Sequence, residues 1–472
     1  MTAREPAVNP RAFAGHGELA FISRGALWLL DGDAVAPQLV AAPRISPASP
    51  AFSPDGRWLA FTASSHPAGA SAVWLAAGDG SGAHQVVARA ELIGWSPVSD
   101  VLAVQAGNAI QLVQPDGSAR ALTRSAGFWG AVWSPDGRYL AVATRIWPSA
   151  TTLAAYPVVG GRPTTWLRLN ARRGVLNGMN EIIAAPAAWW PRWGIGFWVF
   201  GDGMVHNNDQ TPVDVIPAPG ARPRLLGYTL SDQTTTAVAA SNGSLAIVNN
   251  PDLRAVGRII WEDKRVEACS PATGTCTPVP APPSAVTLDP AWSPDGSQLA
   301  YVRAPYRASP AFPQNVTAAW YDAHQLWLYD PATRAVRQLH AAGASVPAWS
   351  ADGKSLLYVA RDAIWLLPRL DGPPVRIAGP LFPPGHWPLS YYGQLGWASQ
   401  FAWWAGNMAV PPARSSALPT PASTTSAALL ADNGIATARF GRPVSQVPAR
   451  LDAIFGPSTR PYRATNNCGI DH

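Results

Sequence analysis

The sequence predicts an all-β protein, a β-propeller with eight four-stranded blades, or seven as the alternative count. A phrase built on Ser-Pro-Asp-Gly recurs along the 472 residues, and a second hairpin pattern follows each copy. The composition agrees, because 41 glycines and 48 prolines suit many short strands joined by turns. We expect the ring to be closed by a C-terminal strand and followed by a disordered tail.

The first hairpin of each unit carries the phrase. It reads AFSPDGRWLAF at 51–61, AVWSPDGRYLAV at 131–142 and AWSPDGSQLAY at 291–301. Pro fixes φ, Asp bonds its own backbone and Gly accepts a positive φ, so the chain reverses and an alternating strand follows. Other copies begin near Trp95 and Trp349, and looser copies near Phe13, Trp189 and Leu230. The mean spacing is about 48 residues, which is typical of propeller blades.

A second hairpin lies between successive copies, as in LWLLDGDAVAPQLV from Leu27 and LWLYDPATRAVRQL from Leu326. Two hairpins per unit give four strands per blade. The fragment Leu395–Trp404 resembles the start of another unit but lacks a second hairpin, and the first unit has only a weak innermost strand. We therefore expect this fragment to complete the first blade, so that the ring has no open edge.

The repeated pairing of WSPDG with LWLYDPAT resembles the TolB-type, WD-repeat-like propellers. It is also similar to the non-catalytic propeller of dipeptidyl-peptidase-type proteins. The resemblance covers 13–404, leaving 1–12 as an N-terminal extension and 405–472 as a tail rich in Pro, Ala, Ser and Thr. It implies a bacterial interaction module in the periplasm or cell envelope. Peptidase activity is not implied, because no G-x-S-x-G elbow occurs and the tail is too short for a hydrolase domain.

Charge and motifs exclude several function classes. The net charge is +6, but the arginines are scattered without a basic run, so no nucleic-acid partner is expected. No stretch is apolar enough to span a membrane, and the N-terminus lacks the apolar core of a signal peptide. The eight histidines form no zinc motif, and no phosphate or calcium loop occurs. We expect a monomer without metal or cofactor.

Cys269 and Cys276 flank the turn SPATGT of one second hairpin. Residues in such positions can lie opposite one another on paired strands, where a disulfide is feasible. A disulfide would indicate an exported protein. The sequence leaves both a disulfide and two free thiols open.

The function is expected on one face of the ring, because long irregular segments should emerge there: Asn170–Pro186, Gly201–Thr211, Arg303–His324 and Gly379–Gln394. We expect a non-enzymatic propeller that binds a protein or peptide. The alternative is a glycan-binding protein or hydrolase with a site at the mouth of the central channel. The candidate contact residues in these segments are Arg172, Arg173, His206, Asn208, Tyr306, Trp320, His386, Trp387, Tyr391 and Tyr392.

Overall fold

The structure is a computed structural model of the whole chain. It describes residues 4–64, 70–146, 150–170, 182–201, 211–229, 237–249, 264–306, 318–382, 397–406, 430–431, 434–435 and 438–439. Two compact units are separated at Leu418. In the unit Pro419–His472, three two-residue strands form a small sheet: β33 (Leu430–Ala431), β34 (Gly434–Ile435) and β35 (Ala438–Arg439).

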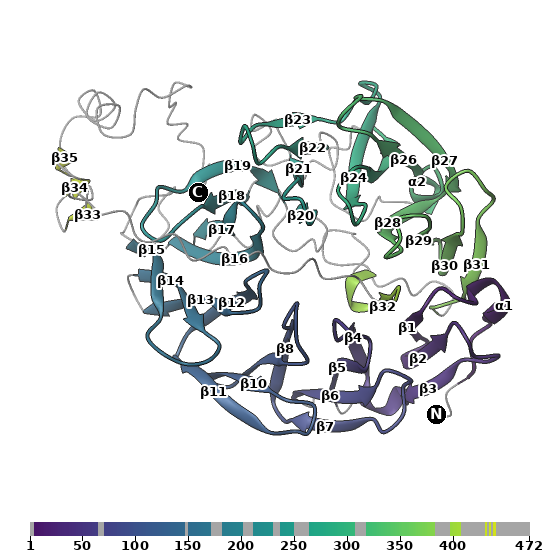
Figure 1. Ribbon diagram of the computed structural model, residues 1–472, viewed down its shortest axis with the longest axis horizontal. Helices are drawn as coiled ribbons and strands as arrows, with labels where there is room; N and C mark the ends of the chain where they lie inside the picture. Colours follow the sequence, from purple (N-terminus) through teal and green to yellow (C-terminus); the bar gives the residue numbers. More distant parts are fainter. Residues whose placement is uncertain are drawn as a thin grey trace, which may run out of the picture. The chain divides into compact units, whose positions relative to one another are not determined.

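The unit Met1–Leu418 contains eight four-stranded antiparallel sheets arranged as the blades of a propeller (Figure 1). This confirms the predicted all-β fold and the count of eight. From the inside outwards, blade 1 holds β32 (Phe401–Trp404), β1 (Glu18–Ser23), β2 (Ala26–Asp31) and β3 (Gln38–Ala41). Blade 2 holds β4 (Pro47–Phe52), β5 (Trp58–Ser64), β6 (Ser71–Ala77) and β7 (His84–Val87). Blade 3 holds β8 (Ala90–Trp95), β9 (Leu102–Ala106), β10 (Ala109–Val113) and β11 (Ala119–Arg124).

The other five blades follow in the same inside-out order. Blade 4 holds β12 (Phe128–Trp133), β13 (Tyr139–Ile146), β14 (Ala150–Pro157) and β15 (Thr164–Asn170). Blade 5 holds β16 (Ile182–Trp190), β17 (Gly194–Gly201), β18 (Thr211–Ile216) and β19 (Arg224–Thr229). Blade 6 holds β20 (Ala237–Ala239), β21 (Leu245–Asn249), β22 (Arg265–Cys269) and β23 (Cys276–Pro278). Blade 7 holds β24 (Ala285–Trp292), β25 (Leu299–Pro305), β26 (Gln325–Tyr329) and β27 (Val336–Ala342). Blade 8 holds β28 (Ala344–Trp349), β29 (Leu356–Ala360), β30 (Ala363–Leu367) and β31 (Val375–Ala378).

Both ends of the propeller segment contribute to ring closure. Strand β32 pairs antiparallel with β1, from Glu18 opposite Trp404 to Phe21 opposite Phe401, which confirms the predicted closing strand. The N-terminal segment adds a second tie, because Asn9 N donates to Ile377 O (2.8 Å) at the outer strand of blade 8. The short helix α1 (Pro10–Phe13) follows directly. Part of the segment expected as an extension, 1–12, therefore contacts the last blade.

The repeated turn forms the same hydrogen-bond pattern wherever Ser and Asp stand two residues apart. In blade 4, the Ser134 hydroxyl donates to Asp136 Oδ1 (2.6 Å) and accepts from Tyr139 N (2.9 Å). The same pair of bonds occurs at Ser53, Ser293 and Ser350. A buried serine thus joins the two ends of each turn, which explains the recurrence of the phrase as a folding signal.

Tryptophans at the ends of innermost strands bind the blade before them. Trp133 Nε1 donates to Gly94 O (3.0 Å) in β8, and Trp349 Nε1 donates to Ala291 O (2.9 Å) in β24. Apolar clusters fill the spaces between blades. For example, Ala103 and Ile110 of blade 3 pack with Leu140 of blade 4. The repeat tryptophans Trp133 and Trp349 are therefore structural.

Two local predictions were wrong. The looser copy placed near Leu230 does not begin blade 6, because β20 begins at Ala237 and the first turn of this blade is 240–244. Here an Asn-Gly turn, in which Asn242 Oδ1 accepts from Ser244 N (2.8 Å), replaces the expected Ser-Asp phrase. Pro186, expected at the end of a long loop, lies inside β16 at a bulge. A proline is tolerated there because a bulge interrupts the ladder.

Candidate binding face

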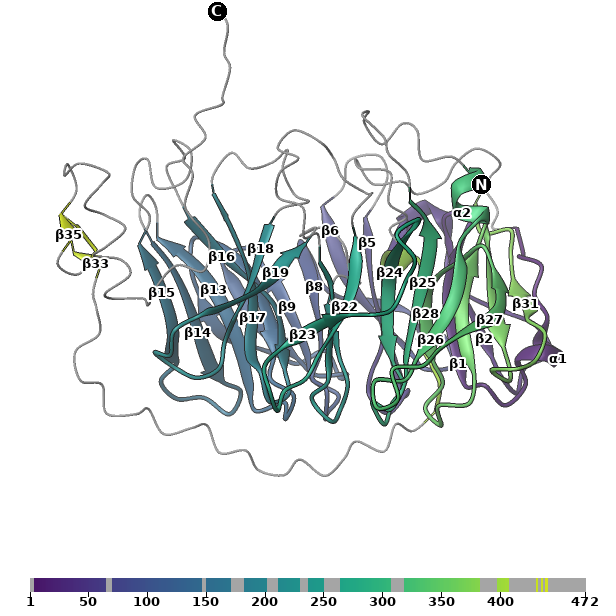
Figure 2. The same ribbon diagram turned by 90° about the horizontal axis from the view of Figure 1, so that it is seen from above.

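The strand order gives the ring two different faces. On one, here called the turn face, short connections join the first strand of a blade to the second and the third to the fourth. They are 32–37, 53–57, 78–83, 96–101, 114–118, 134–138, 158–163, 191–193, 217–223, 240–244, 270–275, 293–298, 330–335, 350–355 and 368–374. Figure 2 shows these turns along one edge of the ring. The other face, here called the loop face, carries every other connection.

Connections on the loop face differ greatly in length around the ring. In blades 1–3 they are short, at 24–25, 42–46, 65–70, 88–89, 107–108 and 125–127. From blade 4 to blade 8 five are much longer, with nine or more residues each, at 171–181, 202–210, 250–264, 306–324 and 379–400. One of these, 250–264, was missed in the sequence, because the strand boundaries of blade 6 were misplaced. The long connections define the candidate binding face.

Eight of the ten predicted contact residues lie outside the described residues. They are Arg172, Arg173, His206, Asn208, His386, Trp387, Tyr391 and Tyr392. Tyr306 is described and is 43% exposed, and its backbone N donates to Ser284 O (2.7 Å). Its exposed ring therefore stands on an anchored backbone at the loop face.

Trp320 is described as well, and it is buried. Only 9% of it is exposed, and its Nε1 donates to Pro305 O (3.0 Å). It lies in helix α2 (Ala318–Asp322) and belongs to the apolar cluster of blades 6–8. The expectation that this indole is a free contact group rested on its position outside the repeat, but the indole packs under the loop face.

A polar group that the sequence did not single out is buried beside Trp320. His324 is 1% exposed, its ring lies 4.3 Å from the Trp320 ring, and its Nδ1 is 3.2 Å from Ser345 Oγ. Burial lowers the pKa of His324 to about 4, so the imidazole is neutral at pH 7. Only tertiary contacts could have identified it, because the local sequence contains no metal or catalytic motif around this residue.

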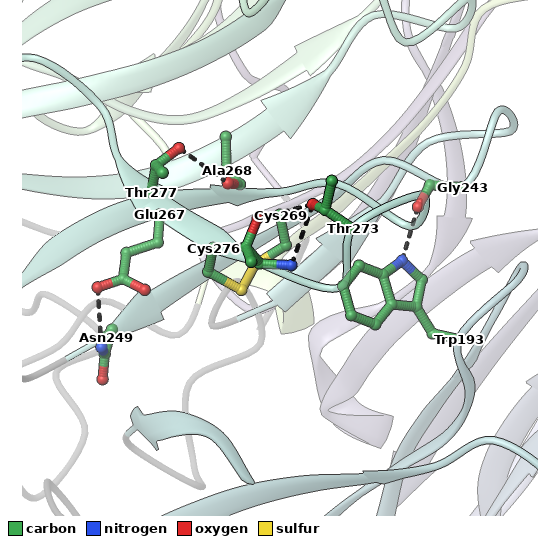
Figure 3. The surroundings of a disulfide bond; sticks show 10 residues. Trp193, Gly243, Asn249, Glu267, Ala268, Cys269, Thr273, Cys276 and Thr277 are labelled. Atoms are coloured by element: carbon green, nitrogen blue, oxygen red, sulfur yellow. Dashed lines mark hydrogen bonds between the residues drawn. A yellow bond between two sulfur atoms is a disulfide. The ribbon is translucent and has the colours of Figure 1, made fainter. Parts of the chain in front are cut away.

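The two cysteines stand opposite one another on β22 and β23, and their sulfur atoms are bonded (Figure 3). The Cα atoms of Cys269 and Cys276 are 3.9 Å apart, closer than the roughly 4.4–6.8 Å expected for a disulfide. Cys269 is 2% exposed and packs with Trp193 of the preceding blade. Trp193 Nε1 in turn donates to Gly243 O (2.7 Å). The disulfide therefore lies at the contact between blades 5 and 6.

Four partly buried carboxyl groups have raised pKa values: Asp100, which pairs with Arg57, and Glu18, Asp214 and Glu267, which lie in three different blades. Burial raises the pKa of Asp214 in blade 5 to about 6, and it also raises the pKa of Glu267 in blade 6. Val213 and Val215 pack toward blade 6, so strand alternation turns Asp214 the other way, toward blade 4. Glu267 accepts from Asn249 Nδ2 (2.9 Å) between blades 5 and 6. Glu18, with a pKa of about 7, is in blade 1. These acids do not form a catalytic pair.

Neither a metal centre nor a membrane span was found in the described part of the chain. No group of three or more His, Cys, Asp or Glu residues there could hold a metal ion. No helix in the same residues is long and apolar enough to cross a membrane.

Comparison with known proteins adds little beyond the fold. No protein-family model matches the chain, and no curated protein sequence matches it. TolB from Acinetobacter baumannii is 14% identical over 68% of this chain and 62% of TolB, with a TM-score of 0.32. An oligogalacturonate lyase from Vibrio parahaemolyticus is 11% identical over 77% of this chain and 96% of the lyase, with a TM-score of 0.41.

A solved prolyl endopeptidase structure is 14% identical over 77% of this chain and 54% of that chain, with a TM-score of 0.43. At such identities and TM-scores, the three structures carry no argument about activity. The chain is an eight-bladed β-propeller on the basis of its own strand pairing.

Proposed function

We propose that this protein is a non-enzymatic propeller that binds a protein or peptide partner through the long connections of its loop face, as an interaction scaffold of the TolB type. The observation that carries the proposal is the asymmetry between the faces. Every turn-face connection has seven residues or fewer, whereas five loop-face connections in blades 4–8 have nine or more. Ordering a residue costs about 1–2 kcal/mol of backbone entropy, and folding of the blades does not require these lengths. Partner binding is the simplest use for them.

The proposed contact residues are those that the sequence places in these connections. Their types suit a protein interface, because arginine and aromatic side chains are enriched at the centres of such interfaces. Tyr306 is the described member, with its ring exposed. Trp320 contributes to packing beneath the face and is not among the proposed contacts.

An enzymatic function has less support. A glycosidase needs two carboxyl groups on either side of one bond, about 5–9.5 Å apart depending on mechanism. Glu18, Asp214 and Glu267, whose pKa values are raised, lie in three different blades, and Asp100, whose pKa is also raised, is paired with Arg57. A periplasmic or other extracytoplasmic location is part of the proposal, and the Cys269–Cys276 bond supports it, because disulfides persist in oxidising compartments.

Site-specific photo-crosslinking in the native host tests the proposal. A photoreactive residue at Tyr306 samples the loop face, and the matched control at Val159 samples the turn face, where this side chain is 96% exposed. We expect a protein adduct from position 306 and none of the same mass from position 159. Equal adducts from both positions, or none from position 306, would contradict the proposed binding face.

A further inference from the structure

Charged residues in blades 1–3 are divided between the two faces. On the loop face, the described charged side chains of these blades are four arginines and one glutamate. They are Arg24, Arg44, Arg89, Arg124 and Glu91. All five are exposed. The four arginines, here called the arginine sector, occupy the short connections of consecutive blades or, for Arg124, the strand end beside one.

The turn face of the same three blades has the opposite charge. Its acidic residues are Glu18, Asp31, Asp33, Asp55, Asp79, Asp100 and Asp116, against the basic residues Arg57 and Arg120. Burial, together with the nearby carboxylates of Asp31 and Asp79, raises the pKa of Glu18 to about 7. This crowding of like charges agrees with a negative potential on the turn face.

Pairing also differs between the faces. Arg57 on the turn face forms ion pairs with Asp55 and Asp100, the latter at 2.6 Å. Within the described residues, the guanidinium groups of the arginine sector make no hydrogen bond or ion pair. Folding therefore leaves four guanidinium groups available on short, well-anchored connections. Guanidinium groups bind carboxylates and phosphates through paired N–H donors.

We infer that the arginine sector binds an acidic polypeptide segment of the partner; this inference rests on the proposed function and names the chemistry of its ligand. The described loop face of blades 1–3 carries no exposed large apolar or aromatic side chain. Base stacking and sugar binding use aromatic platforms, and membrane insertion needs apolar groups. Guanidinium groups can bind the carboxylates of a polypeptide without any aromatic or apolar side chain beside them. The acidic turn face repels the same segment, so the charge also orients the partner toward the loop face.

Fluorescence anisotropy with the full chain tests this inference. The probe is a labelled peptide of alternating Glu and Ser, and a Gln-Ser peptide of equal length measures background binding. One variant combines Arg24→Gln, Arg44→Gln, Arg89→Gln and Arg124→Gln. The control carries the same change in net charge on the turn face, through Arg138→Gln, Arg162→Gln, Arg334→Gln and Arg369→Gln.

We expect the arginine-sector variant to bind the Glu-Ser peptide roughly tenfold more weakly or worse. Each exposed charge pair contributes only part of the binding free energy that corresponds to a tenfold change in affinity, and the variant removes four such pairs. The control should change less than about twofold, and added salt should weaken binding by the wild type. Equal losses in both variants, or equal binding of the two peptides, would overturn the inference. Tighter, arginine-dependent binding of single-stranded RNA, polygalacturonate or phosphatidylglycerol vesicles would also overturn it.

Failure of the inference is distinguishable from failure of the proposed function. If a partner crosslinks from position 306 equally well in the wild type and in the arginine-sector variant, the binding face stands and the acidic segment is wrong. If the peptide binds the arginine sector while position 306 yields no partner, the proposed partner contact at the long connections is wrong and the anion preference of the arginine sector stands.

Discussion

Ring closure can be tested at a single side chain, Trp397. It lies in the short 3-10 turn η4 (Trp397–Ser399) just before β32 and is 2% exposed. Its ring centroid is 5.3 Å from that of Phe382, in the cluster that joins blades 8 and 1. Replacing a buried tryptophan by alanine costs roughly 3–5 kcal/mol, because apolar area and packing are both lost. At about 2.1 cal/mol/K of unfolding entropy per residue, a ring of about 400 residues should then melt about 5 °C lower.

Differential scanning calorimetry on the full chain measures this shift. Val159→Ala is the control, because this side chain is 96% exposed and its loss should leave Tm within about 1 °C. Chains ending at residues 412 and 394 extend the test, since the second lacks β32 and exposes the edge of β1. The first should melt like the full chain and the second should melt lower or fail to fold. If Trp397→Ala and the chain ending at 394 both melt like the wild type, the closure argument is refuted.

Three further outcomes follow from the described contacts. The pKa of His324 is lower in the folded chain (about 4) than its ordinary value of 6.5. The unfolded chain therefore binds the extra proton, and stability should fall by up to about 3 kcal/mol as pH drops from about 6.5 toward 4. An equal pH dependence of Tm in His324→Leu would contradict this. Reducing Cys269–Cys276 should cost about 2–3 kcal/mol, and an unchanged Tm with tris(2-carboxyethyl)phosphine would disprove it. Ser134→Ala removes two hydrogen bonds and should destabilise the ring by about 1–2 kcal/mol in urea unfolding, whereas an unchanged midpoint would contradict the turn argument.

Blade count and closure were predictable because the repeat is chemical as well as geometric. Ser, Asp and Gly recur where the turn needs a hydroxyl, a carboxylate and a positive φ, so Ser53, Ser134 and Ser293 identify three turns independently. Blade 6 was misplaced because it uses Asn242-Gly243 in place of this chemistry. The tie between Asn9 and Ile377 was also missed, since a short bridge between distant segments has no local pattern.

The sequence predicts where the long connections of the candidate binding face lie, but it predicts less well which side chains are exposed there. Connection length follows directly from strand boundaries, so most of the long connections could be identified from the sequence alone. Burial of Trp320 and His324 could not, because it depends on packing between α2 and β28. The arginine sector could not be identified from the sequence, since Arg24, Arg44, Arg89 and Arg124 come to lie on one face only when successive blades are arranged around the ring.

The acidic turn face has an explanation in folding that the arginine sector lacks. Aspartates of the turns accept hydrogen bonds from their own backbone, and bonds from Ser81 and Ser118 lower the pKa values of Asp79 and Asp116. These carboxylates stay ionised, so a negative turn face is a by-product of the turn chemistry. Loop-face connections need no such group, and the guanidinium groups of Arg24, Arg44 and Arg89 make no hydrogen bond or ion pair with the described residues. A charge that folding does not require, on the face that carries the long connections, is most simply explained by the partner that the face binds.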